Sequence, residues 1–200
     1  KLAALPNAAY AAALCEAHNR WVEAEWLNED NDLYGVLLIP PQDPAAAVRE
    51  IERYAGRPRW VAVYLPTCQV YPLWGHRTYF PIMAAAEAAG LPVMLHAVSG
   101  MSWSFPYNLE QFTTSPTAHT VSHVFAMMSN LMNMLENGVM QRYPNLKVVF
   151  TEAGLTWVPF LRMRLDKEYN ENRRQWPHLT ELPSEAIGKL YFATQPVEEP

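Results

Sequence analysis

The sequence predicts an α/β fold in which helices cover a parallel sheet. Short apolar runs of strand length alternate with helical patterns along the 200 residues, and this alternation is typical of a sheet built from consecutive βα units. Two of the helical patterns end in a glycine, Gly56 and Gly90, shortly before the next apolar run, as expected for a helix that stops in a left-handed turn. We count about five strands, whereas the common closed form of this architecture, the (β/α)8 barrel, has eight.

The first half of the chain contains the clearest element boundaries. A long amphipathic helix is expected from Asn7 to about residue 27, with large side chains such as Tyr10 and Trp21 on one stripe. Asp43 and Pro44 begin a second helix, because aspartate is a good N-cap and proline suits the first helical position. The predicted elements are helices over 7–27, 44–54 and 79–89 and strands over 34–39, 60–65 and 92–96.

The second half begins with a stretch, residues 97–116, that lacks clear periodicity. A loop this long after a buried strand is typical of an active-site lid. Ser115 and Pro116 then begin a long helix that we expect to continue to about Tyr143. The remaining predicted elements are a strand over 146–151, a helix over 155–176, a short helix begun by Ser184 and a strand over 189–193.

Both ends of the chain favour a partial barrel. The chain has no initiator methionine and ends just after a strand tip, so we expect residues 1–200 to hold about strands 3 to 7 of a (β/α)8 barrel, as one domain that is incomplete at both ends. An open doubly wound sheet would also fit the strand count. However, no GxGxxG or GxxxxGK[ST] sequence follows any strand, and the nucleotide-binding version is therefore unsupported.

Composition excludes several classes of function. The formal net charge is −5 at pH 7 and Lys and Arg form no cluster, which argues against a nucleic-acid partner. No apolar run approaches the roughly 18 residues that span a bilayer, and no signal peptide opens the chain. Cys15 and Cys68 form neither a CxxC motif nor a disulfide framework, so we expect a protein of the reducing cytoplasm.

Two polar residues stand at the carboxyl ends of apolar strands, which is where chemistry is found in parallel α/β folds. His96 ends the run that begins at Pro92, and Glu152 directly follows the run over 146–151. A neutral imidazole at such a place is a good ligand for a divalent metal, and a carboxylate can move protons. Alternatively, His96 is a buried, hydrogen-bonded core histidine, and Glu152 caps the next helix.

Other candidates surround the same predicted edge. His119 and His123 are four residues apart near the start of the long helix and so lie on one face; one of them is expected to contact a substrate carboxylate, with a surface or core histidine as the alternative. The HxxxH spacing lacks the glutamate that a zinc protease needs, because residue 120 is threonine. Trp103 in the lid stretch, and Gln195 and Glu198 after the last strand, are further candidates for substrate binding.

Three stretches together resemble the amidohydrolase-related family, in the branch of the amidohydrolase superfamily that includes aminocarboxymuconate-semialdehyde decarboxylase and the resorcylate-type decarboxylases. They are Leu91-Pro-Val-Met-Leu-His96, Tyr143-Pro-Asn-Leu-Lys-Val-Val-Phe-Thr-Glu-Ala-Gly-Leu-Thr-Trp-Val-Pro159 and Thr194-Gln-Pro-Val-Glu-Glu-Pro200. The resemblance implies a (β/α)8 barrel with a divalent metal at its carboxyl-end mouth and His96 as the metal-binding histidine of the fifth strand.

The chain departs from that family pattern in two ways. The Asp-x-His-type motif of the first strand and the aspartate ligand of the eighth are absent, and Glu152 stands where the decarboxylases usually carry a histidine. We therefore expect a metal-dependent enzyme that decarboxylates or hydrolyses a small carboxylated, cyclic or aromatic compound. Zinc is the first expected cofactor and manganese the second, and a homo-oligomer is compatible with the sequence. The alternative is a barrel without catalysis that serves as a binding or scaffold protein.

Overall fold

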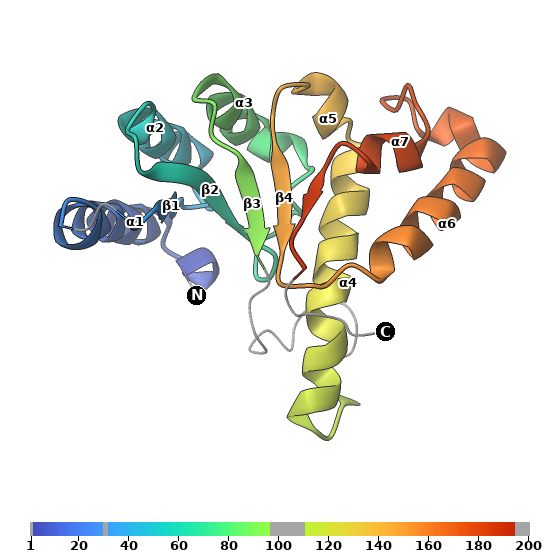
Figure 1. Cartoon of the computed structure of the whole chain (residues 1–200), viewed down its shortest axis with the longest axis horizontal. Coiled ribbons are helices and arrows are strands. Elements are labelled where there is room, and N and C mark those ends of the chain that lie inside the picture. Colours follow the sequence, from blue (N-terminus) through green and yellow to red (C-terminus); the bar gives the residue numbers. More distant parts are fainter. Residues whose placement is uncertain (1, 30–31, 97–110, 195–200) are drawn as a thin grey trace.

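The computed structural model describes residues 2–29, 32–96 and 111–194. Its centre is a five-stranded parallel sheet whose strands follow one another in chain order (Figure 1). The strands are β1 Gly35–Leu37, β2 Trp60–Pro66, β3 Val93–His96, β4 Val148–Thr151 and β5 Tyr191–Phe192. A doubly wound sheet reverses its strand order at a switch point, and this sheet does not. The order is that of a barrel segment.

The edges of the sheet are β1 and β5, the first and last strands in the chain. β1 pairs only with β2, and β5 pairs only with β4, so these two strands do not pair with each other and the described sheet is open. Both strands are shorter than predicted, because strand assignment requires ladder hydrogen bonds and an edge strand has only one partner.

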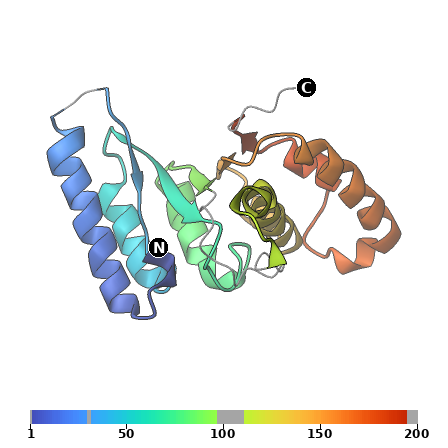
Figure 2. The same ribbon diagram turned by 90° about the horizontal axis from the view of Figure 1, so that it is seen from below.

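The two faces of the sheet are buried to different extents. Val63, Leu65, Val93 and Leu95 alternate on one face and are fully buried, and Figure 2 shows helices along that outer side of the curved sheet. The other face is less completely buried: Ala62 and Pro66 of β2 are buried, but several other residues are only half-buried. Three of them, Tyr64, Met94 and Val149, lie side by side across β2, β3 and β4.

Seven α-helices are present in the described residues: α1 Ala8–Val22, α2 Pro44–Tyr54, α3 Phe80–Ala88, α4 Ser115–Glu136, α5 Val139–Arg142, α6 Trp157–Asn172 and α7 Pro183–Ile187. Short 3₁₀ turns occupy Leu2–Ala4, Arg77–Tyr79 and Arg173–Gln175, and a π-helical turn, Glu23–Leu27, extends α1. The predicted N-cap Asp43 is confirmed, and Asn7, where a helix was expected to begin, is also an N-cap. The Asn7 side chain accepts from the Tyr10 N–H at 2.9 Å, and Asp43 accepts from the Ala46 N–H at 2.9 Å.

The prediction of one helix from Ser115 to about Tyr143 was wrong. α4 ends at Glu136, and a new helix begins after Gly138, whose φ is +67°. Glycine adopts this left-handed conformation without the steric cost that a side chain brings. The carboxyl half of α4 packs in the core, where Met127 and Met134 are fully buried, while its amino half extends past the carboxyl edge of the sheet (Figure 1).

The predicted stripe of α1 was also wrong. Tyr10 and Trp21 are 57% and 51% exposed, and the buried residues are instead Ala11, Cys15 and Asn19. Small side chains let α1 approach closely, and the Asn19 amide then bonds to the edge strand. Its Nδ2 donates to the Leu38 carbonyl at 2.9 Å, and its Oδ1 accepts from the Leu38 N–H at 3.0 Å.

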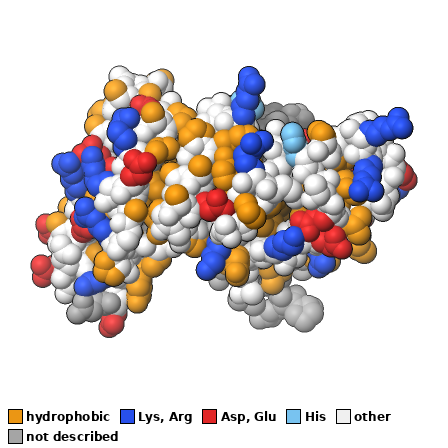
Figure 3. Space-filling view, turned by 90° about the horizontal axis from the view of Figure 1, so that it is seen from above, with side chains coloured by type: hydrophobic (Ala, Val, Ile, Leu, Met, Phe, Trp, Pro, Cys, Tyr) orange, Lys and Arg blue, Asp and Glu red, His pale blue; other side chains and the backbone are white. Residues whose placement is uncertain are grey.

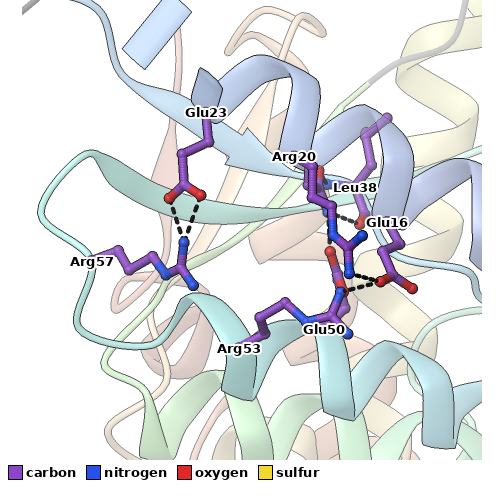
Figure 4. A network of polar contacts seen from close by, with 8 residues as sticks. Glu16, Arg20, Glu23, Leu38, Glu50, Arg53 and Arg57 are labelled. Atoms are coloured by element: carbon purple, nitrogen blue, oxygen red, sulfur yellow. Dashed lines mark hydrogen bonds and ion pairs between the residues drawn. The ribbon is translucent and has the colours of Figure 1, made fainter. Parts of the chain in front are cut away.

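An ionic network surrounds this contact (Figure 4). Asn19 Nδ2 also donates to Glu50 Oε1 at 3.0 Å, and Glu50 pairs with Arg53 at 3.0 Å. Arg53 reaches Glu16 of α1 at 2.8 Å. The network therefore joins α1, the end of β1 and α2.

The surface shown in Figure 3 mixes charges of both signs with apolar side chains, and no single-sign region covers this face. In the described part of the chain, no helix combines the length and apolarity needed to cross a bilayer. Cys15 and Cys68 are both reduced.

Candidate active site

The carboxyl edge of the sheet brings together the tips of β2, β3 and β4. Pro66 lies beside His96, and His96 lies beside Thr151. Hydrogen bonds hold these tips in place. Thr151 Oγ1 donates to the Leu95 carbonyl at 2.8 Å, and Thr67 Oγ1 donates to the His96 carbonyl at 3.3 Å. The main chain at these strand ends is therefore held in place, and so are the Cα positions of the side chains there.

His96 and Glu152 meet at this edge. The Nδ1 atom of His96 lies 3.3 Å from Oε2 of Glu152, and the two side chains are 37% and 40% exposed. Strands β3 and β4 are adjacent in the sheet, so the two side chains come together at neighbouring strand ends. Because a carboxylate accepts and does not donate, a hydrogen bond from a neutral His96 ring to Glu152 would use a proton on Nδ1 and leave the lone pair on Nε2.

Glu152 has an unusual backbone conformation. Its φ is +63°, in the left-handed region that costs a residue with a Cβ roughly 1–2 kcal/mol. Such strain is characteristic of functional sites, where the surrounding structure holds it in place. The alternative in which Glu152 caps the following helix was wrong, since α6 begins at Trp157 with Thr156 as its N-cap.

The two histidines of α4 lie near Glu152. The rings of His119 and His123 are 4.4 Å apart, edge to face. His119 is exposed. His123 is only 7% exposed, and its Nδ1 lies 3.1 Å from the main-chain carbonyl oxygen of Glu152. Its Nε2 is buried, and no hydrogen-bond partner is found for it in the described part of the chain.

Burial lowers the pKa of His123 below its usual value, and the neighbouring His119 lowers it further. The hydrogen bond to the Glu152 carbonyl and the Glu152 charge act in the opposite direction, and His96 adds a smaller lowering effect. The net direction favours a neutral imidazole.

Tyr64 and Cys68 belong to this edge and were missed in the sequence. The Tyr64 ring lies 6.0 Å from the His96 ring, and burial raises the pKa of its phenol, with smaller contributions from Cys68 and Glu152. Tyr64 stands two residues before Pro66, so it shares the half-buried face of the sheet with His96. A phenol near the tip of an apolar strand was a usable signal.

A cavity of about 240 Å³ adjoins Tyr64 on the half-buried face of the sheet. Its walls are mostly apolar, and they are formed by Leu2, Ala3, Leu38, Ile39, Tyr64 and Pro66. The cavity is therefore an apolar recess at the tip of β2, next to the phenol of Tyr64.

The residues of this edge fit a metal in part. His96 and Glu152 are chemically suitable donors. A metal-binding histidine commonly donates its other N–H to a carboxylate, and the Nδ1 atom of His96 has the Glu152 carboxylate beside it. Within the described ranges, no group of three or more His, Cys, Asp or Glu side chains has a metal-binding arrangement. A protein site for zinc uses at least three ligands, so further ligands would have to come from outside these ranges. Trp103, Gln195 and Glu198 also lie outside them.

A sequentially ordered parallel sheet, covered on one face and carrying polar residues at its carboxyl edge, defines part of an α/β barrel of the enzyme type. The profile of the amidohydrolase family matches residues 4–195. The chain belongs to that family, as the resemblance implied. No curated protein matches it.

Solved structures agree on the fold. An amidohydrolase from Mycobacterium avium subsp. paratuberculosis K-10 is 24% identical with a TM-score of 0.76, and the match covers 94% of this chain and 50% of that chain. The 2,6-dihydroxybenzoate decarboxylase from Rhizobium is 16% identical with a TM-score of 0.77, over 96% of this chain and 61% of the other.

A dihydroxybenzoic acid decarboxylase from Polaromonas sp. JS666, solved with bound manganese and the inhibitor 2-nitroresorcinol, is 18% identical with a TM-score of 0.78, over 96% of this chain and 60% of the other. The chain thus spans 50% to 61% of the lengths of these three structures. The expected fold, part of a (β/α)8 barrel, is confirmed.

Proposed function

We propose that the protein is a metal-dependent enzyme that acts on a small carboxylated, cyclic or aromatic compound by non-oxidative decarboxylation or hydrolysis. The observation that carries this proposal is the contact between His96 and Glu152, 3.3 Å long, at the carboxyl edge of a parallel sheet. Family membership and the decarboxylases among the similar structures support it.

His96 is the residue that would hold the metal, through the ring nitrogen that does not contact Glu152. A divalent ion at such a site polarises a carboxylate or carbonyl, or makes bound water acidic enough to attack at neutral pH. Manganese in the Polaromonas decarboxylase supports that ion as a candidate beside zinc. The two ions differ in preferred coordination, and metal analysis would distinguish them.

Glu152 is the residue that would move a proton. In decarboxylation its carboxylic acid protonates the ring carbon that keeps the bonding electrons as carbon dioxide leaves. In hydrolysis its carboxylate takes a proton from the attacking water and returns it to the leaving group. Its exposure of 40% leaves the carboxyl group accessible to a ligand.

The substrate would be held by residues around this pair. We assign His119 to the substrate carboxylate, and its exposed position beside His123 supports this assignment. Tyr64 and the adjoining apolar cavity offer a wall for a ring. Trp103, Gln195 and Glu198 stay predictions for substrate binding, and a cytoplasmic location and a homo-oligomer are likewise part of the proposal.

Metal content and turnover test the proposal in the full-length protein. Decarboxylation of 2,6-dihydroxybenzoate and related acids would be followed by released carbon dioxide, and hydrolysis by product mass. Glu152→Gln should keep its metal and its fold, while turnover falls by roughly 10²-fold or more. If the metal is lost instead and turnover recovers at high metal concentration, Glu152 only orients His96. A metal-free wild type that is active would refute the proposal.

A further inference from the structure

His123 makes a contact that neither its sequence position nor the proposed chemistry explains. It lies 29 residues before Glu152 in the chain and on a different element, yet its Nδ1 is 3.1 Å from the Glu152 main-chain oxygen. A carbonyl oxygen can only accept a hydrogen bond, so the proton of this bond must be on Nδ1 of the imidazole.

The unpartnered atom of His123 agrees with that assignment. With the proton on Nδ1, the buried Nε2 that lacks a partner in the described residues is a lone pair. With the proton on Nε2, that nitrogen would be a buried N–H without an acceptor. The lone pair of Nδ1 would then face a lone pair of the Glu152 carbonyl oxygen, which is repulsive. Buried orphan N–H groups are rarer than under-satisfied acceptors. The lowered pKa of His123 is consistent with a neutral ring.

The carbonyl that His123 holds belongs to the residue with the strained backbone. Glu152 has φ of +63°, and the direction of its side chain toward His96 depends on that turn. A bond to the Glu152 carbonyl fixes the peptide plane that follows the strained φ. Residues in this region persist when the surrounding structure fixes them through several contacts, and His123 provides one from α4.

We propose that His123 is a positioning residue: its Nδ1–H holds the main chain of Glu152 in the left-handed turn that directs the carboxylate to His96. The importance of this positioning for turnover rests on the proposed role of Glu152 as the proton carrier. The geometry of the His96–Glu152 contact does not depend on that role.

The imidazole tautomer tests the geometry without any activity measurement. Full-length protein labelled with ¹⁵N-histidine would be studied by two-bond ¹H–¹⁵N spectra at pH 7.5, with the His123 signals identified by their loss in His123→Asn. The expected result is a neutral ring protonated on Nδ1, the opposite of the tautomer that free histidine prefers. A ring protonated on Nε2, or on both nitrogens, would overturn the proposal.

Two substitutions separate the ring nitrogens. In His123→Asn the amide nitrogen can occupy the place of Nδ1 and donate to the carbonyl, whereas in His123→Gln the amide extends toward the place of Nε2. The readout is the His96 Nδ1 proton, whose signal lies downfield when it bonds to a carboxylate. It should persist in His123→Asn and be lost, or shifted upfield, in His123→Gln. His119→Gln is the matched control on the same helix, and it should leave this signal in place.

Turnover then connects the geometry to the function. Loss of one hydrogen bond of about 1 kcal/mol corresponds to a roughly 5-fold effect, so His123→Gln should lower kcat by roughly 5-fold or more with KM little changed, and His123→Asn should recover most of it. Equal losses in both variants, with the His96 signal unmoved, would show a merely structural histidine. If the wild type has no turnover but the NMR results hold, the proposed function fails and the positioning role stands.

Discussion

The contact of Asn19 with Leu38, which directly follows the edge strand β1, gives the sharpest prediction on stability. Asn19 is fully buried and bonds to both main-chain groups of Leu38 and to Glu50. Its amide thus acts at the sheet edge as a neighbouring strand would, because it donates to one main-chain group and accepts from the other. Asn19→Ala removes all three bonds.

The magnitude follows from the groups left behind. An unsatisfied buried donor or acceptor costs about 1–3 kcal/mol, and Leu38 is half-buried, so we take the lower half of that range for each of its two groups. Glu50 keeps its pair with Arg53 at 3.0 Å. The expected loss in free energy of unfolding is therefore about 3 kcal/mol. Asn19→Asp should cost at least as much, because it adds a second carboxylate beside Glu50.

Urea unfolding of the full-length protein, followed by circular dichroism, measures this loss. Arg20→Ala is the matched control, since Arg20 lies next in α1 and pairs with Glu16 while its side chain is 64% exposed. An exposed pair contributes about 0.5 kcal/mol or less. If Asn19→Ala and Arg20→Ala caused equally small losses in free energy of unfolding, the Asn19 amide would not stabilise the edge of the sheet.

Two further predictions concern packing and pH. Gly75→Ala should destabilise the protein by about 3 kcal/mol or more, because the added Cβ would lie 2.2 Å from the Asn133 carbonyl oxygen. The control is Gly56→Ala, where φ is +76° but the space around the added Cβ is open, and it should cost only about 1 kcal/mol. Similar losses of unfolding free energy in urea for the two variants would contradict the predicted clash at Gly75. The pKa of His123 is lowered in the folded state, so the unfolded chain binds its proton first as pH falls. Its contribution to stability is present above the ordinary histidine pKa of about 6.5 and is lost below it. His123→Asn should therefore flatten the fall in unfolding free energy between pH 6.5 and lower values, and an unchanged slope would contradict the assigned direction. The groups around His123 that influence this titration are His119, Glu152 and His96.

The fold was predictable because its signals are local. Apolar runs, the N-cap Asp43 and the glycines that end helices each depend on a few neighbouring residues, and the strand order then follows from short βα connections. The stripe of α1 was not predictable in the same way. Its burial depends on the approach of a small-residue face to β1 and α2, and the large side chains Tyr10 and Trp21 dominated the sequence pattern while lying on the exposed side.

The site was predictable to the level of strand tips. Because neighbouring parallel strands end at one edge, His96 and Glu152 could be placed together from their positions alone. The left-handed φ of Glu152 and its bond to His123 could not be, since no residue type signals a strained glutamate and the contact joins elements 29 residues apart. Tyr64 could have been noted from its position near the tip of an apolar strand, but its place beside His96 depends on the register of β2 with β3, which sequence does not give.

The most direct test of the metal site at the strand tips is an anomalous-scattering map from crystals of the full-length protein grown with manganese. A peak is expected at bonding distance, roughly 2.0–2.3 Å, from the His96 imidazole, and it should be lost in His96→Ala with the fold retained. A protein that binds manganese elsewhere while His96 carries no peak would contradict the proposed metal site.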